Sequence, residues 1–265
     1  MVDDAKVRAQ AAPHEVTAAD VRSHAAAQLQ TAALAGAAVA LLAGLATWGM
    51  LQATGPVFAI PPELANLPTP APSDKLAELD RALAIASRNN ATYALGLLGL
   101  LLGAFLATAE AVSRRTVRTA IPKGLLAGVT GGLAGAVAGF VGSQAFGYLL
   151  YFPHLSPLGK TIVIQIGALG LLGSGVGLGL GLPYARPRLL ANCILGAVLG
   201  GTLAAVIYPA VVGYLLPVAD TEMVVPGVRG GQLPWVLLTA GLIGLVATGL
   251  GKPRKPHVNK ASGRK

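Results

Sequence analysis

The stretch GLLAGVTGGLAGAVAGFVG, residues 124–142, contains seven glycines and no charged residue. Glycine is among the least favourable residues in a helix exposed to water. In lipid the balance changes, because an unpaired backbone group in hydrocarbon costs far more than the helix penalty of glycine. Small residues also let neighbouring helix backbones approach closely. We therefore predict that this stretch is a transmembrane helix packed tightly against its neighbours.

The composition of the whole chain also favours a membrane protein. Of its 265 residues 54% are hydrophobic, 5% are aromatic and only 12% are charged. A soluble domain carries about 25% charged residues. The single cysteine, Cys193, excludes a disulfide within the chain and a cysteine-based zinc site.

Six segments are long and apolar enough to cross a bilayer, which takes about 20 residues each. They are residues 31–53, 91–112, 124–151, 161–182, 189–211 and 234–251. These spans predict an all-α, polytopic helical bundle that forms a membrane domain over residues 31–251.

The remaining segments are predicted to lie in water. Residues 1–30 form a cytoplasmic helix that starts near Thr17, and residues 252–265 form a basic cytoplasmic tail. Residues 54–90 form an external proline-rich linker and a short helix capped by Ser73, whose leucine face packs on the bundle or on the membrane surface. A small hairpin is expected at Val224, Val225 and Val228, around a Pro-Gly turn.

The distribution of basic residues predicts the orientation. With a cytoplasmic N-terminus, the cytoplasmic segments carry 15 of the 20 lysines and arginines, and the opposite side carries five. Positive charge is enriched in cytoplasmic loops, so both termini are predicted to be cytoplasmic in an inner (plasma) membrane. The net charge of +9 then indicates affinity for anionic lipid headgroups rather than for nucleic acid.

Glycines at helical spacing predict packing faces on several spans. The fourth span has a second glycine face, Gly175 and Gly179, opposite a stripe that begins with Gly167 and Gly170, so we expect this span to be central. The main predicted packing residues are Gly124, Gly128, Gly132, Gly135, Gly139, Gly173, Gly177, Gly181, Gly196 and Gly200.

Short matches in the same order predict an internal repeat. The sequence LGLLG occurs at residues 95–99 and 169–173, LLA at 125–127 and 189–191, and GYLL at 147–150 and 213–216. Both copies start on the same side of the membrane. The second and third spans and the fourth and fifth spans are therefore predicted to be parallel copies of one hairpin.

The stretch LLLGAFLATAEAVSRRTVRTAIPKGLLAGVTGGLAG, residues 100–135, resembles a glycine-zipper hairpin module of bacterial multipass membrane proteins of unknown function. In that module a Leu/Gly helix ends in Ala-Glu-Gly, and an arginine-rich turn leads to a glycine-rich helix. Here Ala109-Glu110 is followed by Ala111, and the turn is Ser113-Arg114-Arg115. The resemblance covers residues 95–140, and residues 169–216 without the glutamate and the double arginine. It implies a membrane module and no reaction.

Polar residues inside the predicted spans are few. Glu110 is the only acidic one, and its spacing from Arg114 predicts an interfacial ion pair, with a proton or cation relay as the alternative. Gln144, Gln165 and Asn192 are expected to hydrogen-bond between helices, with Gln144 and Gln165 as a pair. No catalytic set, metal cluster or cofactor motif is evident, so the chain is predicted not to be an enzyme.

Two functions are compatible with these features. The first is a scaffold or interaction module that forms homo- or hetero-oligomers through its small-residue helix faces. The alternative is a small-solute or ion transporter or channel built on the repeated hairpin. A polar path along Gln144, Gln165 and Asn192 would favour the transporter or channel, and a dry core would favour the scaffold.

Overall fold

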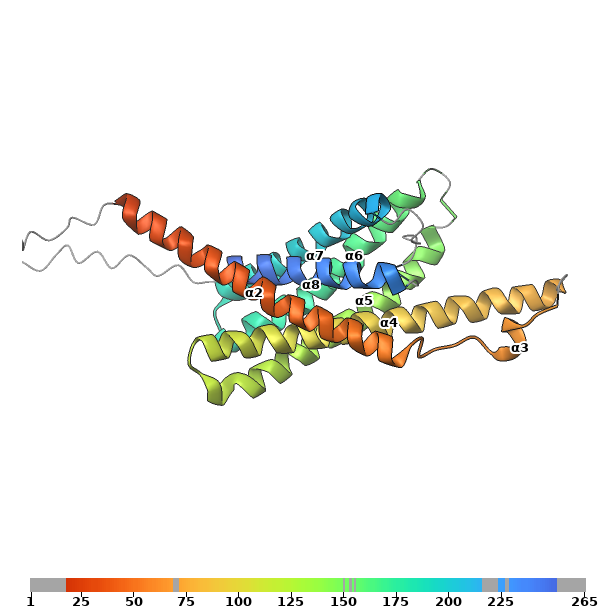
Figure 1. Ribbon diagram of the computed structural model, residues 1–265, viewed down its shortest axis with the longest axis horizontal. Helices are drawn as coiled ribbons and strands as arrows, with labels where there is room; N and C mark the ends of the chain where they lie inside the picture. The colour runs from red at the N-terminus through yellow and green to blue at the C-terminus, as the bar shows by residue number, and fades with distance from the viewer. Residues whose placement is uncertain are drawn as a thin grey trace, which may run out of the picture.

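The computed structural model describes residues 18–68, 72–149, 151–152, 154, 156–215, 224–226 and 229–251, so the predictions for Thr17, Val228 and the basic tail lie outside it. Six long helices in these ranges can each cross a membrane by length and composition, and the described residues contain no strand (Figure 1). The predicted all-α bundle is confirmed. The elements are α2 (Ala18–Thr54), α3 (Pro62–Ala65), α4 (Ser73–Ser113), η1 (Val117–Thr119), α5 (Ala120–Leu149), α6 (Pro157–Gly181), η2 (Leu182–Tyr184), α7 (Pro187–Leu215) and α8 (Arg229–Leu250).

Helix α4 is longer than the sequence analysis predicted. It has 41 residues and runs without a break from the linker into the second span, because no proline or glycine interrupts its first five turns. Ser73 is its first residue and makes no capping hydrogen bond, so the prediction of a separate helix capped by Ser73 is wrong. A helix of this length extends for about 60 Å, twice the thickness of the hydrocarbon core.

The first turns of α4 extend beyond the other five long helices, with only α3 of the described elements beside them (Figure 1), and Leu76 and Leu83 are exposed there. The prediction that this leucine face packs on the bundle is therefore wrong. The linker instead attaches to α4 further along, where the Asn90 side chain exchanges two hydrogen bonds with the backbone of Phe58, at 2.9 and 3.0 Å.

The two ends of the bundle differ in charge. The turns from α4 to α5 and from α6 to α7 lie at one end, which carries Arg114, Arg115, Arg118, Arg186 and Arg188. We call it the basic end, and the opposite end, from which α4 extends, the linker end. Each of the two turns combines a 3-10 helix with a non-glycine residue of positive φ, Arg115 at 57° and Ala185 at 48°.

The hairpins α4–α5 and α6–α7 are closed by the same set of backbone contacts. A methyl group added at Gly99 would overlap the carbonyl oxygen of Gly131, and one added at Gly173 would overlap that of Ala197. Two further contacts of this kind recur in both hairpins. The contact of Gly103 with the Ala127 carbonyl corresponds to that of Gly177 with the Cys193 carbonyl. The contact of Gly135 with the Leu95 carbonyl corresponds to that of Gly201 with the Leu169 carbonyl. In every case the residue of α6 lies 74 positions after its counterpart in α4, as 173 follows 99. The residue of α7 lies 66 positions after its counterpart in α5, as 197 follows 131.

These contacts place most of the predicted packing glycines at helix crossings. Gly124, Gly128, Gly135 and Gly139 meet α4, Gly173, Gly177 and Gly181 meet α7, and Gly196 and Gly200 meet α8. Gly131, absent from the predicted face, is buried and meets the Gly99 carbonyl, whereas its neighbour Gly132 is partly exposed. Gly167 and Gly170 have open space beside them, so their assignment to a packing stripe is wrong.

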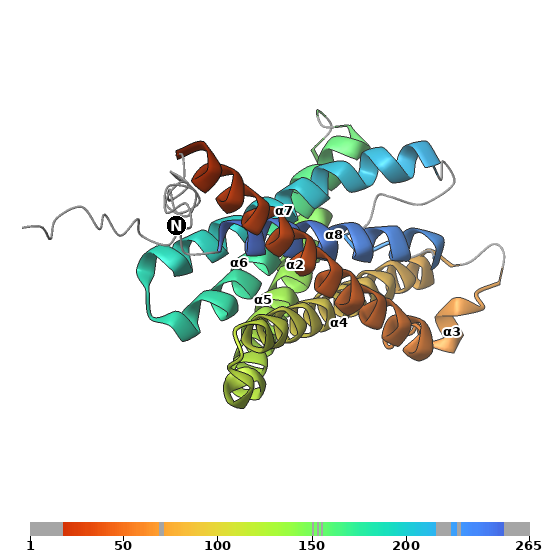
Figure 2. The same ribbon diagram turned by 60° about the vertical axis from the view of Figure 1, so that its left-hand side comes forward.

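A third helix pair repeats this arrangement with the two ends of the described chain. The sequence TAGLIG, residues 239–244 of α8, matches ALGLLG at 94–99 and 168–173. A methyl group added at Gly244 would lie 2.7 Å from the Gly36 carbonyl oxygen of α2, the counterpart of the Gly99–Gly131 contact. Helices α8 and α2 therefore pair as α4 pairs with α5 and α6 with α7 (Figure 2).

The three pairs are arranged around a common core with approximate threefold symmetry. Helices α4, α6 and α8 contact one another at the centre, and α5, α7 and α2 each join one pair to the next. The equivalent residues Leu98, Leu172 and Ile243 are completely buried in a single hydrophobic cluster. The fourth span is the most buried: 56% of the residues in its most apolar stretch are buried, against 28–44% in the other five spans.

Candidate functional site

The core departs from apolar packing in one layer, near the linker end. Gln165 of α6 is 1% exposed, and neither its amide nitrogen nor its amide oxygen has a hydrogen-bond partner among the described residues. An unpartnered polar group in an apolar interior costs free energy. Because such groups are rare in folded proteins, Gln165 is the strongest candidate for a functional side chain in the membrane interior.

Other buried polar atoms lie close to the same level. Leu169 of α6 and Leu242 of α8 contact the adjacent residues Gly201 and Gly200 of α7, so they lie at a similar depth. Gln165 and Thr239 are each about one helical turn nearer the linker end than these leucines. Gln165 and Thr239 therefore also lie at similar depth, on either side of α7. The Thr239 hydroxyl and the indole nitrogen of Trp235 are also buried without a partner among the described residues, as is the Ser143 hydroxyl of α5. We call Gln165, Thr239, Trp235 and Ser143 the polar layer.

The polar layer contains only one of the three polar residues predicted to line a path. Gln144 is exposed on α5, so the predicted Gln144–Gln165 pair does not form. The reason is helical phase, because Gly142 faces α6 and two further residues turn the chain by about 200°. Asn192 is also exposed, whereas its neighbour Cys193 is buried, so Asn192 lies on the outer face of α7.

Helices α2 and α8 are joined by hydrogen bonds that the sequence analysis did not predict. The side chains of Gln52 and Gln232 bond to each other at 2.9 Å, and Gln232 also donates to the Pro226 carbonyl at 3.0 Å. The Thr248 hydroxyl lies 3.3 Å from the Ala32 carbonyl oxygen. The only sequence signal of this pairing is the match of TAGLIG to the LGLLG repeats, which is too short to indicate it without the structure.

At the basic end, a cluster of charged and aromatic side chains joins three elements. Glu110 and Arg114 form an ion pair at 2.7 Å, with both side chains about one third exposed. The Arg114 guanidinium lies 4.8 Å from the ring centre of Tyr184, and the Lys123 ammonium lies 5.0 Å from it. A partly exposed ion pair contributes at most about 1 kcal/mol, and the cation–π contacts add a similar amount each. The cluster thus holds α4, α5 and η2 together at their ends.

The described residues contain no group of three or more histidine, cysteine, aspartate or glutamate side chains that could hold a metal ion. No family model, curated protein or solved structure matches the chain. The physical arrangement of the side chains therefore carries the functional argument.

Replacing Gln165 by methionine, which has a similar shape, is expected to stabilise the protein. The change removes two buried unpartnered polar atoms, each group of this kind costing about 1–3 kcal/mol in mutational data. Thermal unfolding of the purified protein in detergent should shift to higher temperature. A lower melting temperature would mean that Gln165 has a bonding partner in the folded protein, such as water or a ligand.

Proposed function

We propose that this integral membrane protein is a non-enzymatic scaffold of the inner membrane, which binds other membrane proteins through its outer helix faces. The observation that carries the proposal is the buried apolar centre of the bundle. Along the approximate threefold axis, Leu98, Leu172 and Ile243 are followed toward the basic end by Leu102, Val176 and Ala247, all buried. Such apolar layers offer a solute no polar groups to replace its water, whereas they suit a rigid body.

The outer faces of two helices carry regular ridges that suit helix packing. Leu133, Val137 and Val141 follow one another at intervals of four residues on α5, as do Leu195, Leu199 and Leu203 on α7, and all six are exposed. Ridges at this spacing fit the grooves of a neighbouring helix. Shape-selective contacts of this kind drive helix association in lipid, where the hydrophobic effect does not.

Site-specific photo-cross-linking in native membranes tests the scaffold. A benzophenone amino acid replaces Leu133 or Leu199, with Leu42, an exposed residue of α2 outside both ridges, as the control. The proposal expects a protein adduct of discrete mass from at least one ridge position and none from position 42. Lipid adducts alone at both ridge positions would contradict it.

A second candidate, a pathway for a small polar solute or an ion, is favoured by the polar layer alone. In this case Gln165, whose amide has no hydrogen-bond partner among the described residues, would bind the permeating species. Gln165→Met would then abolish flux in proteoliposomes. Flux that persists in this variant, together with the higher melting temperature expected above, would rule out this candidate.

We also propose that both termini and the basic end face the cytoplasm, on the basis of the arginine-rich turns. The prediction is tested with single cysteines at Val117, beside the α4–α5 turn, and at Ala77, in the extended part of α4, in a Cys193→Ser background; both positions are exposed. An impermeant thiol reagent added outside intact spheroplasts should label position 77 and leave position 117 unlabelled. Labelling of position 117 from outside would reverse the orientation.

A further inference from the structure

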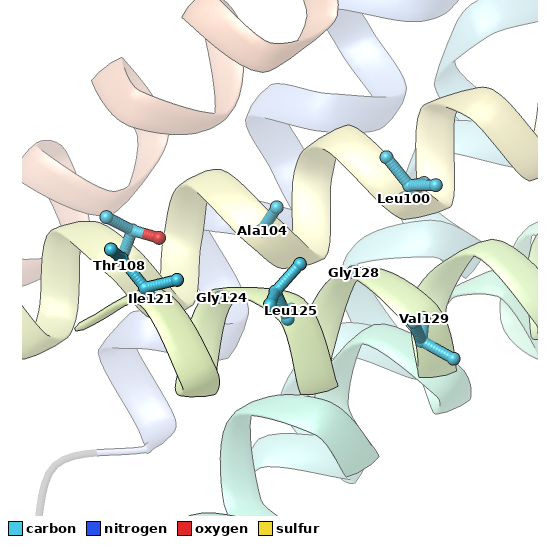
Figure 3. A pocket seen from close by; sticks show the side chains of 8 residues that line it. All are labelled: Leu100, Ala104, Thr108, Ile121, Gly124, Leu125, Gly128 and Val129. Atoms are coloured by element: carbon cyan, nitrogen blue, oxygen red, sulfur yellow. The ribbon is translucent and has the colours of Figure 1, made fainter. Parts of the chain in front are cut away.

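An apolar groove runs between α4 and α5 in the half of the bundle nearest the basic end (Figure 3). Its volume is about 300 Å³. Ala104 and Thr108 of α4 and Gly124 and Gly128 of α5 line it, and Thr108 supplies its only polar side chain. Ile121 and Leu125 also line it, with 74% and 64% of their surface exposed. The groove is therefore open to the surface of the bundle.

The α6–α7 hairpin has large side chains at the positions equivalent to the small residues of the groove. With the offsets that relate the two hairpins, the counterparts of Ala104, Thr108, Gly124 and Gly128 are Leu178, Leu182, Leu190 and Ile194. Leu190 packs inward, because its side chain would lie 2.7 Å from a methyl group added at Gly181. The same backbone arrangement thus carries four large side chains in one hairpin and four small ones in the other, so the groove is a specific feature of α4–α5.

Positive charge lies in the turn next to the basic end of the groove, which we call its mouth. The α4–α5 turn carries exposed Arg115 and Arg118, only a few residues from Ile121 and Gly124. Arginine binds phosphate with paired, charge-assisted hydrogen bonds, and basic side chains at the membrane surface attract anionic lipids. A second copy of this chain is a poor occupant, because copies inserted in one bilayer share an orientation and would bring like-charged turns to the same level.

From the apolar groove and its basic mouth we propose that α4–α5 binds one anionic phospholipid, with an acyl chain along Ala104, Thr108, Gly124 and Gly128 and the phosphate on Arg115 and Arg118. The small side chains admit the chain, and the two arginines select the headgroup. This site goes beyond the proposed scaffold function: it lies closer to the basic end than the α5 ridge, although its lining residue Val129 is only one turn from Leu133.

Native mass spectrometry of the detergent-purified protein tests the site by comparing phosphatidylglycerol with phosphatidylcholine of the same acyl chains. The wild-type protein should retain phosphatidylglycerol about thirtyfold more strongly, the scale expected for two basic residues near a headgroup. Ala104→Leu with Thr108→Leu, the residues of the second hairpin, should abolish this retention. Arg115→Asn with Arg118→Gln should make retention of the two lipids equal; asparagine tolerates the positive φ of position 115.

Ala38→Leu, at an exposed position of α2, is the matched control and should bind like the wild type. Equal retention of both lipids by the wild-type protein would overturn the proposal. The proposal would also be overturned if the Ala104→Leu, Thr108→Leu variant melts like the wild type and still retains phosphatidylglycerol as strongly. It would be overturned too if the wild-type protein is a dimer and this variant is a monomer, because a second copy would then occupy the groove.

A phosphatidylglycerol with a photoreactive acyl chain gives a test on the unaltered protein. Its adducts should map to peptides that contain residues 104–128, and adducts confined to other helices would overturn the site.

Discussion

Alanine in place of Gly135 is expected to lower the free energy of unfolding by about 1–3 kcal/mol, the usual cost of overpacking a tight core. The added methyl group would overlap the backbone carbonyl oxygen of Leu95 on α4. A side chain could rotate away from such a clash, but a backbone carbonyl within a helix cannot, so α4 and α5 must separate. Thermal unfolding of the purified protein in detergent should show a clear decrease in melting temperature.

Three variants serve as comparisons. Gly201→Ala should cost about as much as Gly135→Ala, because its methyl group would meet the Leu169 carbonyl in the same way. Gly132→Ala should cost less, because its methyl group would lie 3.1 Å from the Cβ of Leu100, a tight contact that a shift of a few tenths of an ångström relieves. Val137→Leu, on an exposed face, should change stability by no more than about 0.5 kcal/mol. Equal melting temperatures for all four variants would refute backbone-to-backbone packing of the hairpins.

The second large effect concerns the α8–α2 pair. Gly44→Cys combined with Ala240→Cys, in a Cys193→Ser background, is expected to give a disulfide between the first and last spans in nearly every molecule. A Cβ atom added at Gly44 would lie 3.2 Å from the Cβ of Ala240. A disulfide requires a Cβ–Cβ distance of about 3.5–4.5 Å, so the two helices need to move apart only slightly to form it. Oxidation in isolated membranes, followed by mass determination of the remaining free thiols, measures the yield.

The control pair keeps Ala240→Cys and moves the other cysteine by one residue, to Leu45→Cys. Leu45 is exposed on a different face of α2, so its thiol points away from α8. This pair should remain reduced under the same conditions. Similar disulfide yields from both cysteine pairs would mean that α2 has no fixed rotation relative to α8. The pairing of α2 with α8 described above would then be refuted.

The sequence was informative where local pattern determines structure. Length and apolarity identified all six spans, because each helix must satisfy its own backbone in lipid. The rotation of each helix about its axis was harder to predict, since adjacent glycines such as Gly131 and Gly132 differ by about 100° and only the position of α4 decides which one is buried. The same uncertainty led to the incorrect placement of Gln144.

Features that depend on distant parts of the chain were missed. The pairing of α2 with α8 brings together residues such as Gly36 and Gly244, and the TAGLIG match was too short to indicate it without the structure. The candidate site was predicted in part: Gln165 was identified from its polarity within a span. Its lack of a partner could not be predicted, because it depends on which side chains of α5, α7 and α8 reach the same level.

The α8–α2 pair has a consequence for biosynthesis. Helix α2 is made first among the six spans and its partner α8 last, whereas α4–α5 and α6–α7 are each complete as soon as two consecutive helices have been made. Until α8 has been made, the Gly36 and Gly44 face of α2 has no partner helix to cover it. A chain that stops before residue 229 can assemble both consecutive hairpins yet leaves α2 unpaired. The 22-residue helix α8 thus completes the third helix pair, and a chain truncated before it leaves a helix face of α2 uncovered.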